Sequence, residues 1–161
     1  LGLETVKRTK KGLANMKSKE KNLTNKAPYL IECNFNSEKP RQKFSSDVSY
    51  IKCKDGILYL SAIKDYFNTE IVSFSTSNYN NIDLIKESYK DLNPTKDSIV
   101  NTDQGSVYFA YEYIELSKTL GFTRSMSHKG HCWENCPIEN WFMQLKHEWL
   151  CQFDKLPEFD S

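Results

Sequence analysis

The order of hydrophobic patterns along the chain restricts its fold more than any other feature of the sequence. Residues 44–53 alternate apolar and polar side chains, and residues 57–63 form a nearly continuous apolar run. These are the patterns of β-strands with one or both faces buried. The dipeptide Asp55-Gly56 between them is a hairpin turn signal. With a further apolar stretch at 71–74, the sequence predicts three consecutive antiparallel strands.

Helical and extended patterns alternate in the second half of the chain. Residues 82–92, 107–120 and 137–149 have the apolar spacing of helices. Short strands are predicted between these helices, at 98–102 and 122–125. The predicted fold class is therefore α/β, with a mixed five-stranded sheet in which three antiparallel strands are followed by alternating helices and strands. Helices are expected to flank both faces of this sheet.

The size and composition of the chain indicate one domain. Its 161 residues, of which 39% are hydrophobic, are enough for a single buried core. No apolar stretch approaches the roughly 20 residues that span a membrane, and no apolar leader opens the sequence. The five cysteines are odd in number and irregularly spaced, which argues against a disulfide framework. We therefore expect a cytoplasmic protein.

The charge of the chain is unevenly distributed. The net charge is +1, but residues 1–26 contain eight basic and two acidic residues, a balance of +6. We expect residues 1–27 to be a basic, poorly ordered N-terminal arm that does not pack on the core, and residues 28–161 to be the folded domain. Such an arm is suited to nucleic acid, because Lys and Arg neutralise phosphates. A merely solvated terminus is the alternative.

Three acidic residues occupy strand ends and a helix start, where chemistry collects in sheets covered by helices. Asp47 lies in the first predicted strand, Asp103 directly follows the fourth, and Glu139 lies in the first turn of the last helix. Aspartate is a poor strand former, so Asp47 needs a particular reason to be there. Structural roles are the alternative: Asp103 could start a turn, and Glu139 could complement the helix dipole.

Short words around these acids are similar to those of a known family. Residues 46–51 (S-D-V-S-Y-I) resemble its T-D-I-T-Y-I segment, and residues 101–106 (N-T-D-Q-G-S) resemble its H-S-D-Q-G-S word. Residues 125–146 are similar to its S-M-S-R-K-G-N…D-N-A-x-x-E-x-F-F…L-K run, and 35 residues separate the second acid from the third. Over about residues 28–153 the chain thus resembles OrfB-type transposases of bacterial insertion sequences, in the DDE superfamily that includes retroviral integrases.

The resemblance implies an RNase H-like fold and metal-dependent DNA strand cleavage and strand transfer during transposition. Asp47, Asp103 and Glu139 would be the catalytic residues and the ligands of two Mg²⁺ (or Mn²⁺) ions, which stabilise the attacking and leaving oxygens at phosphorus. The implied partners are DNA, as element ends and as target, further copies of this chain, and an upstream-frame protein with a helix-turn-helix. In a bacterium the protein would be nucleoid-associated when bound to DNA. The residues expected to contact DNA are Lys146, Lys129 and His128.

Departures from the family pattern leave other interpretations open. The family usually has Arg where this chain has His128 and Asn where it has His131. The chain ends before the family's later words, so residues 28–161 are expected to be a C-terminally truncated core. The alternative function is an inactive remnant that binds DNA or interferes with the full-length enzyme without catalysis. A zinc site formed by His128, His131, Cys132 and Cys136 is a further alternative, although adjacent His131 and Cys132 do not readily bind one tetrahedral ion together.

Overall fold

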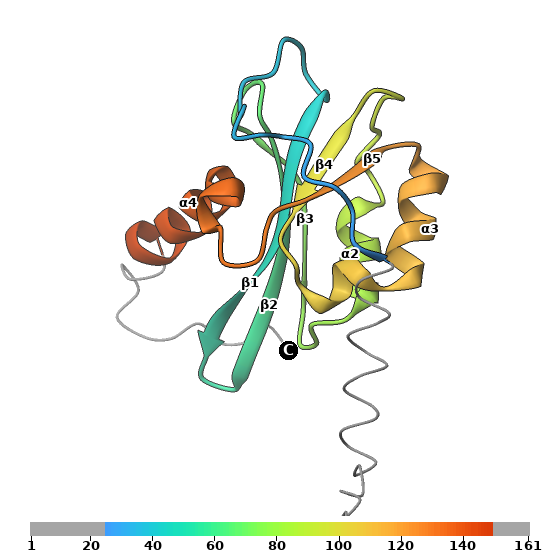
Figure 1. Ribbon diagram of the computed structural model, residues 1–161. Helices are drawn as coiled ribbons and strands as arrows, with labels where there is room; N and C mark the ends of the chain where they lie inside the picture. Colours follow the sequence, from blue (N-terminus) through green and yellow to red (C-terminus); the bar gives the residue numbers. More distant parts are fainter. Residues whose placement is uncertain (1–24, 150–161) are drawn as a thin grey trace, which may run out of the picture.

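A mixed five-stranded sheet forms the centre of the protein. The computed structural model describes residues 25–149 (Figure 1). The strand order is β3-β2-β1-β4-β5; β1, β2 and β3 pair antiparallel, while β4 and β5 continue the sheet parallel to β1. The predicted α/β fold class is confirmed, with five strands in the predicted order along the chain. These strands are β1 (Lys43–Cys53), β2 (Gly56–Asp65), β3 (Ile71–Ser77), β4 (Ile99–Thr102) and β5 (Thr123–Met126).

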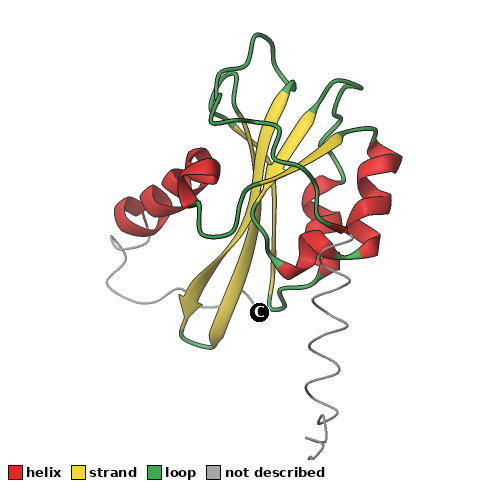
Figure 2. Cartoon of the chain, viewed as in Figure 1, coloured by secondary structure: helices red, strands yellow, loops and turns green. Residues whose placement is uncertain are grey.

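Helices cover both faces of the sheet (Figures 1 and 2). Helices α2 (Ile82–Tyr89) and α3 (Tyr111–Leu120) lie on one face, and α4 (Cys136–Gln144) lies on the other. Each face has its own apolar cluster, because successive side chains of a strand point to opposite sides. The cluster under α2 and α3 includes Phe44, Ile63, Ile85, Tyr89, Val100 and Tyr113. The cluster under α4 includes Leu60, Ala62, Ile138 and Phe142.

Local signals account for where α2 begins and α3 ends. The side chain of Asn81 caps α2, since its Oδ1 accepts a hydrogen bond from the backbone N–H of Leu84 at 3.2 Å. Gly121 ends α3 in a left-handed conformation with φ of 79°, which glycine adopts without a steric cost. Both features follow from residues that lie within the element or next to it, so the sequence predicted them.

The sequence predicted one continuous helix over residues 107–120, but the structure breaks it. The segment consists of a 3-10 helix, η1 (Ser106–Phe109), and of α3, separated by Ala110 in an extended conformation. The carbonyl of Tyr108 accepts a hydrogen bond from Arg124, and that of Phe109 accepts one from Asn25. These side chains occupy carbonyls that a continuous helix would use internally, so the helix begins again after Ala110.

The described chain begins slightly inside the predicted N-terminal arm. The side-chain amide of Asn25 donates to the carbonyl of Phe109 at 2.7 Å, and Ala27 is buried. These residues therefore pack on the domain, whereas residues 1–24 lie outside the described part, and the basic arm stays a prediction. Within residues 25–149, no helix has the length and apolar character needed to cross a membrane.

Truncation of a core residue of α2 should destabilise the protein strongly. Ile85 is fully buried in the cluster beneath α2 and α3, and removing most of such a side chain leaves a cavity. We expect Ile85→Ala to lower the free energy of unfolding by about 2–5 kcal/mol. Ile57→Ala, at a position that is 45% exposed, is the matched control and should cost less than about 1 kcal/mol. Denaturant unfolding measures both, and equal losses would contradict this assignment of the core.

Candidate active site

The parallel pairing of β1 with β4 places two of the predicted acids side by side. Ser46 of β1 is in register with Thr102 at the end of β4, so Asp47 of β1 lies next to Asp103, which directly follows β4. Neighbouring strands are about 4.8 Å apart. Each carboxylate accepts a backbone hydrogen bond of 2.7 Å, Asp47 from the N–H of Val48 and Asp103 from that of Gly105.

Helix α4 supplies the third acid from the face of the sheet on which Asp47 lies. Asp47 shares its side of β1 with Ile51, which packs against the apolar cluster under α4. Ile138 is fully buried in that cluster, and Glu139 is the next residue along the helix. The ammonium group of Lys64, on β2, donates to the carbonyl of Pro137 at 3.2 Å. The first turn of α4 is therefore attached to the sheet by both apolar and polar contacts.

An open pocket joins Asp103 and Glu139. Its volume is about 460 Å³, and its wall also includes residues of the loop between β5 and α4. Gly105 lies close to the Asp103 carboxylate: a Cβ atom at this position would be 2.9 Å from Oδ1. A larger residue at this position would therefore require the carboxylate to shift.

The three carboxylates influence one another electrostatically. Burial, followed by the negative charges of Asp103 and Glu139, raises the pKa of Asp47 to about 7. Burial also raises the pKa of Asp103, and burial together with the charge of Asp103 raises the pKa of Glu139. The structure therefore brings the three predicted acids into one region in which carboxylates raise the pKa of their neighbours, although 92 positions separate the first from the last. Such a region attracts cations.

Two lysines lie beside the acidic triad formed by Asp47, Asp103 and Glu139. Lys146 belongs to a π-helix, η3 (Leu145–Trp149), that continues α4. Its ammonium group lies 4.6 Å from the centre of the Tyr50 ring, and its charge lowers the pKa of Asp47. Lys129 lines the pocket together with His128. The residues expected to contact DNA therefore lie around the same site.

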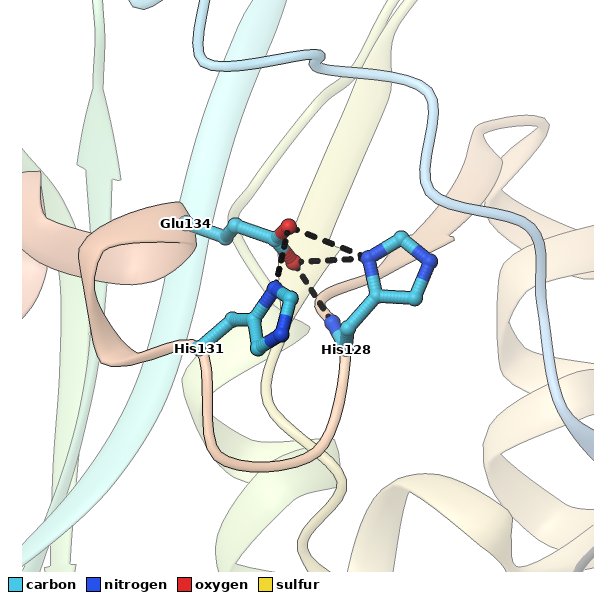
Figure 3. A group of neighbouring side chains, drawn as sticks. All are labelled: His128, His131 and Glu134. Carbon is cyan, nitrogen blue, oxygen red and sulfur yellow. Dashed lines mark hydrogen bonds and ion pairs between the residues drawn. The ribbon is translucent and has the colours of Figure 1, made fainter.

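Glu134, which was not among the predicted site residues, also lies in this region. Its buried carboxylate contacts both His128 and His131 (Figure 3). Burial alone would raise the pKa of Glu134, but hydrogen bonds from His128 and His131 outweigh it and lower the pKa. Within residues 25–149 these three residues form a tight group of potential ligand atoms, which Cys132 and Cys136 do not join. The three-residue spacing of H-x₂-H-x₂-E was the signal available in the sequence.

Known proteins similar to this chain include one family model and several proteins named as transposases. The family described as integrase core domain matches residues 37–132. The putative transposase InsK of insertion sequence IS150 from Escherichia coli is 32% identical over 138 residues, which cover 82% of this chain and 49% of InsK. A transposase-like protein from Haemophilus influenzae is 34% identical over 80% of this chain and 60% of its own length. The chain thus spans about half the length of the relatives it matches.

Solved structures show the same fold. The HTLV-2 integrase catalytic core domain, determined in complex with magnesium, has a TM-score of 0.58 at 18% identity over 74% of this chain and 79% of that domain. A chain of the simian T-cell lymphotropic virus intasome, determined in complex with PP2A regulatory subunit B56 gamma, has a TM-score of 0.65 at 16% identity, over 83% of this chain and 48% of its own length. These values confirm the RNase H-like fold that the resemblance of the short sequence motifs implied.

Replacement of Asp47 by Asn should stabilise the metal-free protein at neutral pH. With the folded pKa raised to about 7, the native state holds this proton more tightly than the unfolded chain. The contribution of Asp47 to stability therefore falls as the pH rises from about 4 to about 7. In buffer that contains a chelator at neutral pH, Asp47→Asn should raise the free energy of unfolding by an amount on the order of 1–3 kcal/mol. This gain in stability should vanish near pH 4.

The matched control for this prediction is Asp55→Asn. Asp55 is an exposed acid in the turn that follows the same strand, and Asn suits that turn equally well. Urea unfolding at several pH values measures both variants. If the Asp47 variant gained no more stability at neutral pH than the Asp55 variant, ionisation of Asp47 would not destabilise the folded protein.

Proposed function

The chain belongs to the integrase core domain family, with transposases of insertion sequences among its relatives, and from this premise we propose that it is the catalytic core of a DNA transposase. The reaction is metal-dependent DNA strand cleavage and strand transfer. The observation that carries the proposal is the placement of Asp47 next to Asp103 by the pairing of β1 with β4, with Asp103 and Glu139 lining one open pocket. Acids that were neutral, or that formed ion pairs with basic residues, would not attract cations in this way.

The chemistry of the acidic triad fits divalent metal ions. Three carboxylates provide the hard oxygen ligands that Mg²⁺ and Mn²⁺ prefer. The charges of both other acids raise the pKa of Asp47, so a bound cation would stabilise the ionised form of Asp47 more than that of the other two acids. We propose that Asp47, Asp103 and Glu139 would together hold two such ions. Bound there, the ions would neutralise phosphate charge and acidify the attacking water or 3′-hydroxyl.

The surrounding residues orient the triad and the DNA. The backbone N–H groups of Val48 and Gly105 hold one oxygen each of Asp47 and Asp103, which leaves the second oxygen of each for a ligand. The charge of Lys146 reaches Asp47, so a phosphate bound by this lysine lies next to the triad. Lys129 and His128 provide further contacts to DNA from the loop wall of the pocket.

The proposed partners follow from the reaction. Transposition joins element ends to a target, so the core acts on two DNA molecules. The solved relatives include dimeric and trimeric forms of an integrase core and an intasome, which supports a homo-oligomer in the transposition complex. We further propose that an upstream-frame protein with a helix-turn-helix supplies recognition of the DNA ends, with the assembly located at the nucleoid.

Loss of one acid should abolish cleavage and spare DNA binding. With Mg²⁺ or Mn²⁺, the purified chain should nick supercoiled plasmid DNA, and Glu139→Gln should lower the nicking rate by at least about 100-fold, because it removes a charged metal ligand. DNA affinity should change less than about threefold, since basic residues supply it. Gel separation of nicked from supercoiled plasmid gives the rate, and fluorescence anisotropy gives the affinity.

The control is Asp83→Asn, an exposed acid on α2 across the sheet from α4, which should nick as the unaltered chain does. Unchanged nicking by Glu139→Gln would remove Glu139 from the active site. If the unaltered chain bound DNA and divalent ions without nicking any substrate, the inactive remnant would be the better description.

Lys146 should contribute to DNA affinity through one phosphate contact. Lys146→Gln is expected to weaken binding equally for unrelated DNA sequences and to reduce the slope of log K against log salt concentration by about 1. Lys90→Gln is the matched control, because Lys90 is exposed at the end of α2 and pairs only loosely with Glu87, at 3.6 Å. Anisotropy titrations at several salt concentrations measure the slope, and equal slopes in both variants would argue against a DNA contact by Lys146.

A further inference from the structure

The loop between β5 and α4 directs two imidazoles at one buried carboxylate (Figure 3). Glu134 lies in a 3-10 helix, η2 (Cys132–Asn135), and its side chain is only 7% exposed. Nδ1 of His128 lies 3.0 Å from both carboxylate oxygens, and Nδ1 of His131 lies 3.1 Å from Oε1. One potential ligand atom from each residue lies within 4.8 Å of the other two. This spacing is suited to a single metal ion.

Neighbouring groups hold the ligand atoms in this arrangement. The His131 ring stacks on that of Trp133, with centroids 4.5 Å apart, and the His128 ring meets that of Tyr29 edge to face at 5.5 Å. The backbone N–H of His128 donates to Oε2 of Glu134. Tyr29 comes from a distant part of the sequence, so the tertiary fold sets the orientation of His128. Ligands oriented in advance lose less freedom when an ion binds.

Two imidazole nitrogens and one carboxylate oxygen form a donor set for Zn²⁺ or a similar borderline ion, whereas Mg²⁺ favours oxygen alone. The side chains of His128 and His131 are 53% and 45% exposed, so an ion can enter from solvent and keep water as a fourth ligand. We propose that His128, His131 and Glu134 bind one zinc-class ion at a site chemically distinct from the acidic triad.

This ligand set differs from the cysteine-containing set considered from the sequence. Cys132 and Cys136 flank Glu134 along the chain, but the group of ligand atoms in the described residues takes the carboxylate between them instead. The family pattern has other residues at the positions of both histidines, so this donor set is a feature of this chain and not of the family pattern. The remaining ring edge of His128 faces away from Glu134 (Figure 3), where it can still contact DNA.

The position of the site links it to the candidate active site. His128 and His131 line the pocket that also contains Asp103 and Glu139, and Glu134 precedes Glu139 by five residues. An ion bound to the three ligands would link His128 and His131 of the loop to Glu134, which lies two residues before α4. Its effect is therefore to stabilise the wall of the pocket, without replacing the oxygen-bound ions of the triad.

The experiment is a titration of the full 161-residue chain with Zn²⁺ in a large excess of Mg²⁺. The excess Mg²⁺ saturates oxygen-only sites, so calorimetry reports the site with imidazole ligands. We expect one Zn²⁺ per chain and a rise in the melting temperature, because an ion that binds only the native state stabilises it. Substitution with Co²⁺ should give the visible absorption of a low-symmetry site without a thiolate-to-metal charge-transfer band.

Variants identify the ligands. The double variant His128→Arg/His131→Asn carries the residues of the family pattern, which favours its folding, and it should lose at least about 100-fold in Zn²⁺ affinity. His147→Asn removes the third histidine of the chain and is the matched control, with affinity expected within about twofold of the unaltered chain. Cys132→Ser/Cys136→Ser and Asp47→Asn/Asp103→Asn should likewise retain Zn²⁺ binding.

Several outcomes would overturn the proposal. Unchanged affinity in the double histidine variant would exclude these ligands. Loss of binding in the cysteine variant, or a thiolate band with Co²⁺, would assign the ion to the cysteines, and loss in the aspartate variant would assign it to the acidic triad. Absence of stoichiometric Zn²⁺ binding by the unaltered chain would leave Glu134 as a hydrogen-bonding partner of the histidines only.

Discussion

The burial of two neighbouring carboxylates where parallel strands pair is the constraint on which the site depends. Asp47 and Asp103 follow the paired positions Ser46 and Thr102 of β1 and β4, and burial, followed by the charge of Asp103, raises the pKa of Asp47. The strands cannot slip to separate the two carboxylates, because Phe44 and Val100 on the same two strands are fully buried, and a shift of one residue would turn them out of the core. The apolar core therefore holds the charges together.

The second face of the sheet completes the site by the same means. Ile138 and Phe142 of α4 pack on Leu60 and Ala62 of β2, and this contact sets Glu139 near the two aspartates. The site thus depends on two apolar clusters that do not share residues. Substitutions in either cluster, far from the acids, should therefore alter the site by changing the distance between β1 and α4.

The loop from β5 to α4 connects two kinds of metal chemistry in one pocket. The acidic triad has oxygen ligands alone, which suit Mg²⁺ and the handling of phosphate. The group of His128, His131 and Glu134 has nitrogen ligands as well, which suit a softer ion and a structural role. Because the two donor sets favour different ions, both proposed sites could be occupied together, and an ion at the histidines would stabilise the loop without competing for the ions of the triad.

The sequence by itself determined the elements and the identity of the acids, since strand alternation, the Asn81 cap, the Gly121 terminus and the words around Asp47 are local properties of the chain. The break at Ala110 escaped prediction because the groups that occupy the neighbouring carbonyls, on Asn25 and Arg124, are distant in sequence. Only the tertiary structure decided the raised pKa of Asp47 and the pairing of the histidines with Glu134 instead of the cysteines. Electrostatic coupling and ligand geometry depend on distances in space, which sequence spacing does not specify once the chain folds back on itself.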